Sequence, residues 1–122
     1  AVRAGLLDGT IATIATVNAP HTTESKELPF DQAPPGMLGL ETALALALTE
    51  LDLSITQVLA AMSWNPAKVA GVDDVHGRPI AEGEPANLCV IDPEVKWTVD
   101  GANMASRSTN TPSTPSARAS GI

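Results

Sequence analysis

The sequence is poor in aromatic residues, cysteine and long apolar runs, and each shortage excludes a class of protein. With two Trp, one Phe and no Tyr, any core must consist mainly of Ala, Leu, Val and Ile. The single cysteine, Cys89, excludes an internal disulfide and a Cys-rich zinc cluster, and it fits a reducing cytoplasm. The longest apolar stretch, residues 43–48, is far shorter than the roughly 20 residues of a spanning helix. We therefore expect a cytoplasmic protein with no membrane role.

Positive charge is also scarce. Seven Lys and Arg face 14 Asp and Glu, which gives a net charge of −7. Because nucleic acids are bound through a basic surface, this balance excludes nucleic acid as a partner. The N-terminus shows no signal pattern for export, and it begins with Ala rather than Met, as if inside a helix. We expect the chain to be a fragment.

The first zone of the chain, residues 1–72, is expected to hold one buried strand and three helices. The β-branched run at 11–17 predicts the strand, and the polar, Pro-rich stretch at 18–37 predicts a long loop after it. Leu spacing predicts a helix over 38–51. Residues typical of helix ends predict two further helices. One covers residues 55–63 and begins with a capping box from Ser54 to Gln57. The other covers residues 66–70, with Asn65 as its N-cap and Gly71 as its left-handed stop.

The rest of the chain looks different. Residues 73–110 are β-like, with strands expected at 86–91 and 96–99. From residue 111 to 122 the sequence is rich in Pro and Ser without an apolar period, which predicts a disordered tail.

Five segments, in order, resemble one known family. Segment 14–21 reads Ile-Ala-Thr-Val-Asn-Ala-Pro-His, where class I dihydroorotases, a group of cyclic amidohydrolases, normally read Ile-Ala-Thr-Asp-His-Ala-Pro-His. The other matching segments are 29–44 (Pro-Phe-Asp-Gln-Ala-Pro-Pro-Gly-Met-Leu-Gly-Leu-Glu-Thr-Ala-Leu), 65–68 (Asn-Pro-Ala-Lys), 77–92 (from Gly-Arg-Pro-Ile to Ile-Asp), and 97–99 with 106–112. Together they make the chain similar to the C-terminal part of a class I dihydroorotase.

The resemblance implies an α/β fold. Residues 1–72 would be the last β/α unit of a (β/α)8 amidohydrolase barrel, and residues 73–110 part of a small β domain. Because such a barrel takes about 250 residues, this chain would form only an incomplete one. The implied activity is the interconversion of dihydroorotate and N-carbamoyl-L-aspartate in pyrimidine biosynthesis, with zinc as the cofactor of the full-length family.

The resemblance also assigns roles to residues. Val17 occupies the position of the family's catalytic Asp, and an isopropyl group can neither bind a metal nor move a proton, so no catalytic residue is expected here. Asn18 replaces the neighbouring family His. His21 matches the residue that binds the substrate carboxylate, together with the backbone at Pro35 and Gly36. No metal ligands are expected, and none of the family's zinc is expected to bind this chain alone.

Each candidate also has a plainer interpretation. From spacing alone, His21 is a solvated loop residue and Pro35-Gly36 an ordinary turn. His76 is interpreted as a surface turn residue and Cys89 as a small buried hydrophobe in a strand. Trp64 is expected to pack at the helix junction rather than stack on a ligand.

Three hypotheses follow for the whole chain. It is an incomplete, inactive piece of a zinc amidohydrolase with a small-molecule substrate, a metal-free homologue that acts as a structural partner of aspartate transcarbamoylase, or a non-functional gene remnant. Upstream His-x-His coding sequence, co-purification with the transcarbamoylase, and loss of cooperative melting would respectively distinguish them.

Overall fold

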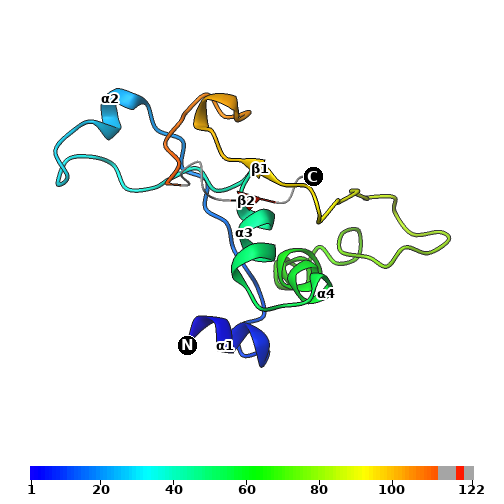
Figure 1. The fold of residues 1–122 in the computed structure, drawn as a ribbon. Coiled ribbons are helices and arrows are strands. Elements are labelled where there is room, and N and C mark those ends of the chain that lie inside the picture. Colours follow the sequence, from blue (N-terminus) through cyan, green and yellow to red (C-terminus); the bar gives the residue numbers. More distant parts are fainter. Residues whose placement is uncertain (113–117, 120–122) are drawn as a thin grey trace.

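The computed structural model describes residues 1–112 and the residue pair Arg118–Ala119, and it is mainly helical and irregular (Figure 1). Short helices and a central helical pair are joined by long loops, and two loops project away from the helices on opposite sides. In chain order the elements are α1 (Val2–Leu7), α2 (Thr23–Lys26), α3 (Ala43–Glu50), α4 (Ile55–Leu59), the π-helix η1 (Ala60–Trp64), α5 (Asn65–Ala70), β1 (Trp97–Thr98), the 3₁₀-helix η2 (Gly101–Asn103) and β2 (Arg118–Ala119).

The strand expected at residues 11–17 does not form among the described residues. A strand needs a neighbouring strand to pair its backbone groups, and the segment runs instead past helices. The N–H of Ile14 donates to the carbonyl of Ala61 at 2.8 Å, and the carbonyl of Ala12 accepts from the side chain of Asn65 at 2.8 Å. The barrel unit built on this strand therefore stays a prediction.

Helix α3 begins at Ala43, five residues later than the Leu spacing predicts. The delay has a cause in the backbone at Gly39 and Leu40, whose N–H groups donate to the side-chain oxygen of Asn18 at 3.1 and 3.3 Å. Gly39 also lies against the neighbouring segment, since a Cβ there would stand 2.6 Å from the carbonyl oxygen of Val17. These contacts hold the chain out of helical register until residue 43.

Residues 55–70 form one continuous helical segment rather than two helices. Its start is confirmed, because Ser54 and Gln57 make both hydrogen bonds of a capping box. Its end is confirmed too, with Gly71 in the left-handed conformation at φ 67°. The cap expected at Asn65 is wrong: the segment passes through a π-turn in which the Asn65 N–H donates to Ala60 O. Pro66 lacks an N–H and crowds the carbonyl four residues back, which explains the wider turn before it.

The strand expected at 86–91 is wrong for the described structure, which shows no strand there. Leu88 and Val90 are 62% and 89% exposed, and no described strand lies beside them to form a ladder. Cys89 is exposed as well, so the buried site expected for it is also corrected. The strand expected at 96–99 is found in shorter form as β1, which pairs antiparallel with β2.

The tail expected to be disordered, 111–122, lies mostly outside the described residues. Within it, Pro112 lines the wall of a cavity described below, and β2 pairs Ala119 with Trp97. The disordered tail therefore stays a prediction for the residues that lie outside the described part of the chain.

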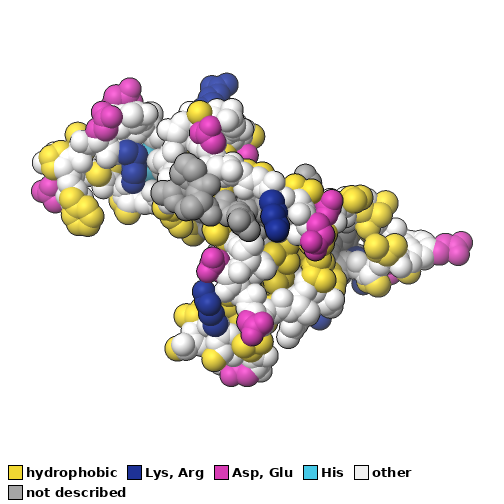
Figure 2. Space-filling view, viewed as in Figure 1, with side chains coloured by type: hydrophobic (Ala, Val, Ile, Leu, Met, Phe, Trp, Pro, Cys, Tyr) yellow, Lys and Arg dark blue, Asp and Glu magenta, His cyan; other side chains and the backbone are white. Residues whose placement is uncertain are grey.

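The buried core is small and consists of short side chains, as the composition predicts. Its members are Leu38, Ala45, Ala47, Val58, Ala61, Ala67 and Val99, with Thr42 as the one buried polar residue among those described. Many large apolar side chains are left at the surface, and Figure 2 shows them scattered over the visible face. None of the described helices is long and apolar enough to cross a membrane.

Candidate functional site

Three segments far apart in the sequence meet around residue 36. The N–H of Ala19 donates to the carbonyl of Met37 at 2.9 Å, which joins the segment after residue 17 to the end of the long loop. The N–H of Leu38 donates to the carbonyl of Asn110 at 3.0 Å, which adds the C-terminal segment. The structure thereby brings together the three residues expected to bind a substrate, His21, Pro35 and Gly36.

The ring of His21 is held against the loop. Its Nε2 lies 3.0 Å from the carbonyl oxygen of Pro35. A carbonyl oxygen can only accept, so Nε2 carries the proton and donates. Because Nε2 is engaged, the remaining ring nitrogen, Nδ1, is the one that a ligand would meet. The side chain is half-buried, so it is neither sealed in a core nor freely solvated.

Gly36 allows the loop to approach. Its φ of +117° lies in a region that favours glycine. A Cβ built there would stand 2.5 Å from the Cβ of Ala19 and 3.4 Å from Nε2 of His21. The N–H of Gly36 bonds to no residue within the described part of the chain. An unpaired backbone donor without a side chain beside it is suited to an anion.

Lys26 supports the same loop from the other side. Its Nζ donates to the carbonyl of Pro34 at 3.0 Å and to that of Gly36 at 3.2 Å. The short helix α2 positions it, with Thr22 accepting the N–H of Ser25 as its cap. The site therefore holds one fixed ammonium group near the two residues that face each other, His21 and Gly36.

Asn110 completes the site. Its side-chain oxygen accepts the backbone N–H of His21 at 3.1 Å, and its amide nitrogen donates to the carbonyls of Ala19 and Gly36 at 2.9 and 3.4 Å. The sequence prediction included neither Asn110 nor Lys26. Asn110 lies inside the matched segment 106–112, which was the one available signal. For Lys26 nothing in the sequence distinguished it from other surface lysines.

Val17 lies beside this site but contributes no chemistry. It is 76% exposed and has no polar side-chain atom. The neighbouring Asn18 is used structurally, since its side-chain oxygen accepts two N–H groups at residues 39 and 40. Within the described residues, no three His, Cys, Asp or Glu side chains come together to hold a metal ion. The residues present therefore do not fit the zinc that the resemblance implies for the full-length family.

The other candidates lie elsewhere. His76 is in an exposed turn, with Nδ1 at 3.4 Å from the side-chain nitrogen of Asn87, in keeping with a surface role. Trp64 sits at the junction of η1 and α5, where Gly77 packs against its backbone. Cys89 and Trp64 line a second hollow of about 650 Å³ beside the loop that follows α5. None of the three approaches His21.

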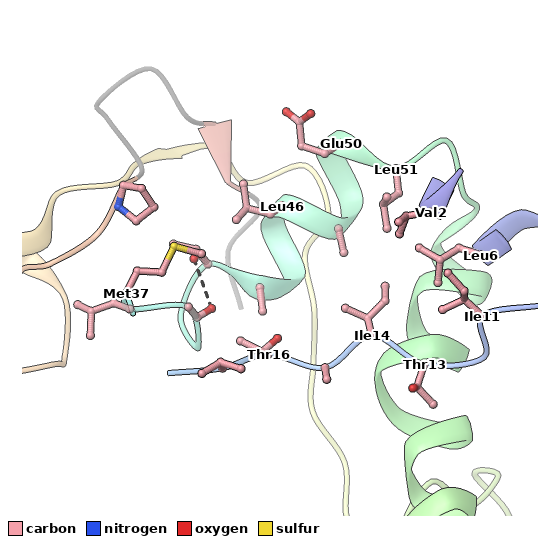
Figure 3. Close-up of a pocket in the computed structure, with 18 of the residues that line it drawn as sticks. Val2, Leu6, Ile11, Thr13, Ile14, Thr16, Met37, Leu46, Glu50 and Leu51 are labelled. Carbon is pink, nitrogen blue, oxygen red and sulfur yellow. Dashed lines mark hydrogen bonds between the residues drawn. The ribbon is translucent and has the colours of Figure 1, made fainter. Parts of the chain in front are cut away.

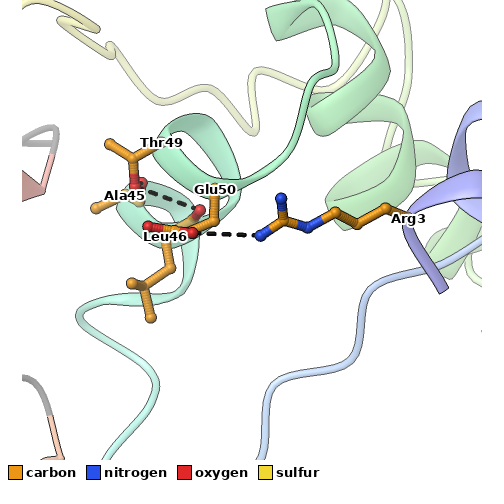
Figure 4. Close-up of polar contacts among 5 residues, drawn as sticks. All are labelled: Arg3, Ala45, Leu46, Thr49 and Glu50. Carbon is orange, nitrogen blue, oxygen red and sulfur yellow. Dashed lines mark hydrogen bonds and ion pairs between the residues drawn. The ribbon is translucent and has the colours of Figure 1, made fainter.

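A larger, apolar cavity of about 820 Å³ separates the segment at 11–17 from α3 and α1 (Figure 3). Ile14 and Thr16 lie on one side of it, with Leu46 and Leu51 across from them. An exposed ion pair, Arg3 to Glu50 at 3.3 Å, links α1 to α3 at its edge (Figure 4). Its walls are mostly apolar carbon, so it offers an anion little to bind.

The chain is similar in sequence to curated proteins named dihydroorotase. It is 50% identical over 116 residues to the dihydroorotase of Mycobacterium leprae, 48% to that of Mycobacterium tuberculosis and 47% to that of Pelotomaculum thermopropionicum. Each match covers 92% of this chain. The chain therefore belongs to the dihydroorotase family, which confirms the resemblance to the C-terminal part of such an enzyme.

The match covers only a small part of each relative. The chain spans 26–27% of the length of these three relatives. No family model matches it.

Proposed function

We propose that the chain carries the carboxylate-binding part of a dihydroorotase substrate site, and that the reaction it serves is the interconversion of N-carbamoyl-L-aspartate and dihydroorotate in pyrimidine biosynthesis. Identity of 42–50% to curated dihydroorotases supports the substrate class. The observation that supports the proposal is the 3.0 Å contact between His21 Nε2 and the Pro35 carbonyl, which joins the imidazole to the peptide whose N–H, at Gly36, bonds to none of the described residues.

The binding chemistry follows from the donors. With Nε2 donating to Pro35, His21 can offer an anion only Nδ1, and Nδ1 donates only when the ring is protonated. This part of the chain would then offer a carboxylate two separate donors, Nδ1–H of a protonated His21 and the backbone N–H of Gly36, which lies on the opposite edge of the trans Pro35–Gly36 peptide from the carbonyl. The ammonium group of Lys26, fixed to the Gly36 carbonyl, adds positive charge at close range. Such charge-assisted bonds are stronger than neutral ones.

Catalysis is not part of this proposal for the isolated chain. Opening or closing an amide ring needs a group that can activate water and move a proton. The position beside the site is Val17, whose side chain does neither, and the described residues do not fit a metal. We propose that the chain alone retains no zinc and does not convert either compound.

The test is an NMR titration of the ¹⁵N-labelled chain with N-carbamoyl-L-aspartate. We expect saturable shifts at the amides of His21 and Gly36. His21→Ala should weaken binding about tenfold, which corresponds to about 1.4 kcal/mol. The matched control is His76→Ala, an exposed histidine in another loop, which should bind like the unaltered chain. Equal binding by His21→Ala and the unaltered chain would contradict the proposal.

One observation favours a second candidate, a structural partner of aspartate transcarbamoylase. Large apolar side chains that line the 820 Å³ cavity are exposed, among them Val2, Met37 and Leu46. Such surfaces commonly mark a protein interface. Sedimentation of the chain with and without the transcarbamoylase distinguishes the two candidates, because a structural partner forms a complex whether or not N-carbamoyl-L-aspartate binds.

A further inference from the structure

We propose that Asn110 is a positioning residue that sets the distance between His21 and Gly36 in the carboxylate site, so that the C-terminal segment controls substrate affinity. The inference rests on the proposed function above. It concerns a residue that lies 89 positions away from His21 in the sequence and bonds to the backbone N–H of His21.

The first support is that both polar atoms of the Asn110 side chain, and its backbone carbonyl, form hydrogen bonds. Its side-chain oxygen accepts from His21, its side-chain nitrogen donates to Ala19 and Gly36, and its backbone carbonyl accepts from Leu38. One residue therefore bonds to both halves of the site. A side chain at this place must present one acceptor and two donors in a plane, which is the inventory of a primary amide.

The second support is the shape of the gap that Asn110 spans. Gly36 and Ala19 stand so close that no Cβ fits between them, and the same two residues accept the two N–H bonds of the Asn110 amide. The Asn110 amide therefore holds the loop at Gly36, where the loop comes closest to Ala19. Half-burial of Asn110 shields these bonds from competition with water.

The substitution Asn110→Asp distinguishes a positioning role of the Asn110 side chain from a role in filling space. Asn110→Asp keeps the shape and the acceptor for His21 N–H, but it loses both donors and puts a negative charge beside the carbonyls of Ala19 and Gly36. We expect the loop at Gly36 to lose its hydrogen bond to residue 110, while the N–H of His21 keeps its bond to that residue. Asn110→Ala removes the bonds to both segments, at Gly36 and at His21. The matched control is Asn87→Ala, which removes an amide that also bonds a backbone carbonyl but in the exposed loop after α5.

The experiment measures two quantities in each variant: affinity for N-carbamoyl-L-aspartate by NMR titration, and hydrogen-exchange protection of the His21 and Leu38 amides. We expect both substitutions at 110 to weaken binding at least tenfold. The His21 amide should keep its protection in Asn110→Asp and lose it in Asn110→Ala, which a general loss of folding does not produce. The amide of Val58, in the distant capped helix, reports that the variants remain folded.

The two possible failures are distinguishable. If the unaltered chain binds and both variants bind equally well, the role of Asn110 is overturned while the carboxylate site stands. If the unaltered chain does not bind N-carbamoyl-L-aspartate at millimolar concentration, the proposed function fails, and this inference fails with it.

Discussion

Gly36 and Ala19 lie so close that a Cβ added to Gly36 would stand 2.5 Å from the Cβ of Ala19. Real Cβ atoms do not approach so near, so Gly36→Ala must push the loop away from the segment that carries His21. With the cost of a positive φ included, we expect a loss of stability of about 1–3 kcal/mol, measured by urea unfolding, together with loss of N-carbamoyl-L-aspartate binding.

The control for this substitution is Gly83→Ala. Gly83 also has a positive φ, +86°, but nothing lies within 4 Å of an added Cβ. It should cost about 1 kcal/mol through backbone strain alone and leave binding unchanged. If Gly36→Ala behaves like Gly83→Ala in both measurements, the close approach at Ala19 does not shape the site.

Restoring the family residues at 17 and 18 should not restore a metal site. Val17→Asp combined with Asn18→His supplies two groups, whereas the described residues hold no cluster of three metal ligands that these groups could complete. The substitution at 18 also removes the acceptor for the N–H groups of Gly39 and Leu40, which should cost about 1–3 kcal/mol. Zinc content after dialysis, measured by atomic emission, checks this, and one zinc per chain would contradict it.

The capping box at the start of α4 gives a stability prediction that is independent of function. Ser54→Ala removes the acceptor for the Gln57 N–H and should lower the free energy of unfolding by about 1 kcal/mol. Thr56→Ala, an exposed change two residues later in the same helix, should have a smaller effect. Equal losses in the two variants would show that the cap does not stabilise the helix in this chain.

The loop after α5 should open in acid. Hydrogen bonds from Arg78, at 2.5 and 2.6 Å, lower the pKa of Glu84 from its ordinary value. A carboxyl whose pKa is lower in the folded chain stabilises the fold above its unfolded pKa, and this contribution is lost as pH falls through the folded value. We expect the Arg78 side-chain NMR signals to become those of a free guanidinium only in acid, once the pH has fallen below the ordinary carboxyl range.

Two variants check the acid effect. Glu84→Gln should show the free guanidinium signals at neutral pH, and the control Glu82→Gln should behave like the unaltered chain. Arg78 signals that do not change between neutral pH and full protonation of the carboxyl groups would contradict the prediction.

The sequence predicted those features that depend on neighbours in the chain. The capping box at Ser54, the left-handed stop at Gly71 and the pairing region around Trp97 are local patterns, and they are found. Two other features were missed, the first set by a distant segment and the second by the neighbouring Pro66. The start of α3 is delayed by bonds to Asn18, and the π-turn at Asn65 accommodates Pro66 while the Asn65 side chain reaches Ala12.

The strands at 11–17 and 86–91 failed for a different physical reason. A β-branched, apolar run indicates that a segment favours an extended conformation. A strand forms only where the backbone of a second strand can pair with it through hydrogen bonds. Here Ile14 bonds to a helix and Val90 remains exposed.

The candidate site shows the same division. His21 and Pro35-Gly36 were found through a resemblance in sequence, and the structure brings them together at 3.0 Å. The bonds that hold them there come from Lys26 and Asn110, through side chains that reach across 10 to 91 positions. No local pattern indicates such pairings.

The most direct test of the central claim is one NMR sample of the unaltered chain, titrated with N-carbamoyl-L-aspartate and followed for a day. The proposal predicts saturable shifts at the His21 and Gly36 amides, with no dihydroorotate formed. Amide shifts that do not saturate, or that appear equally in His21→Ala, would contradict it.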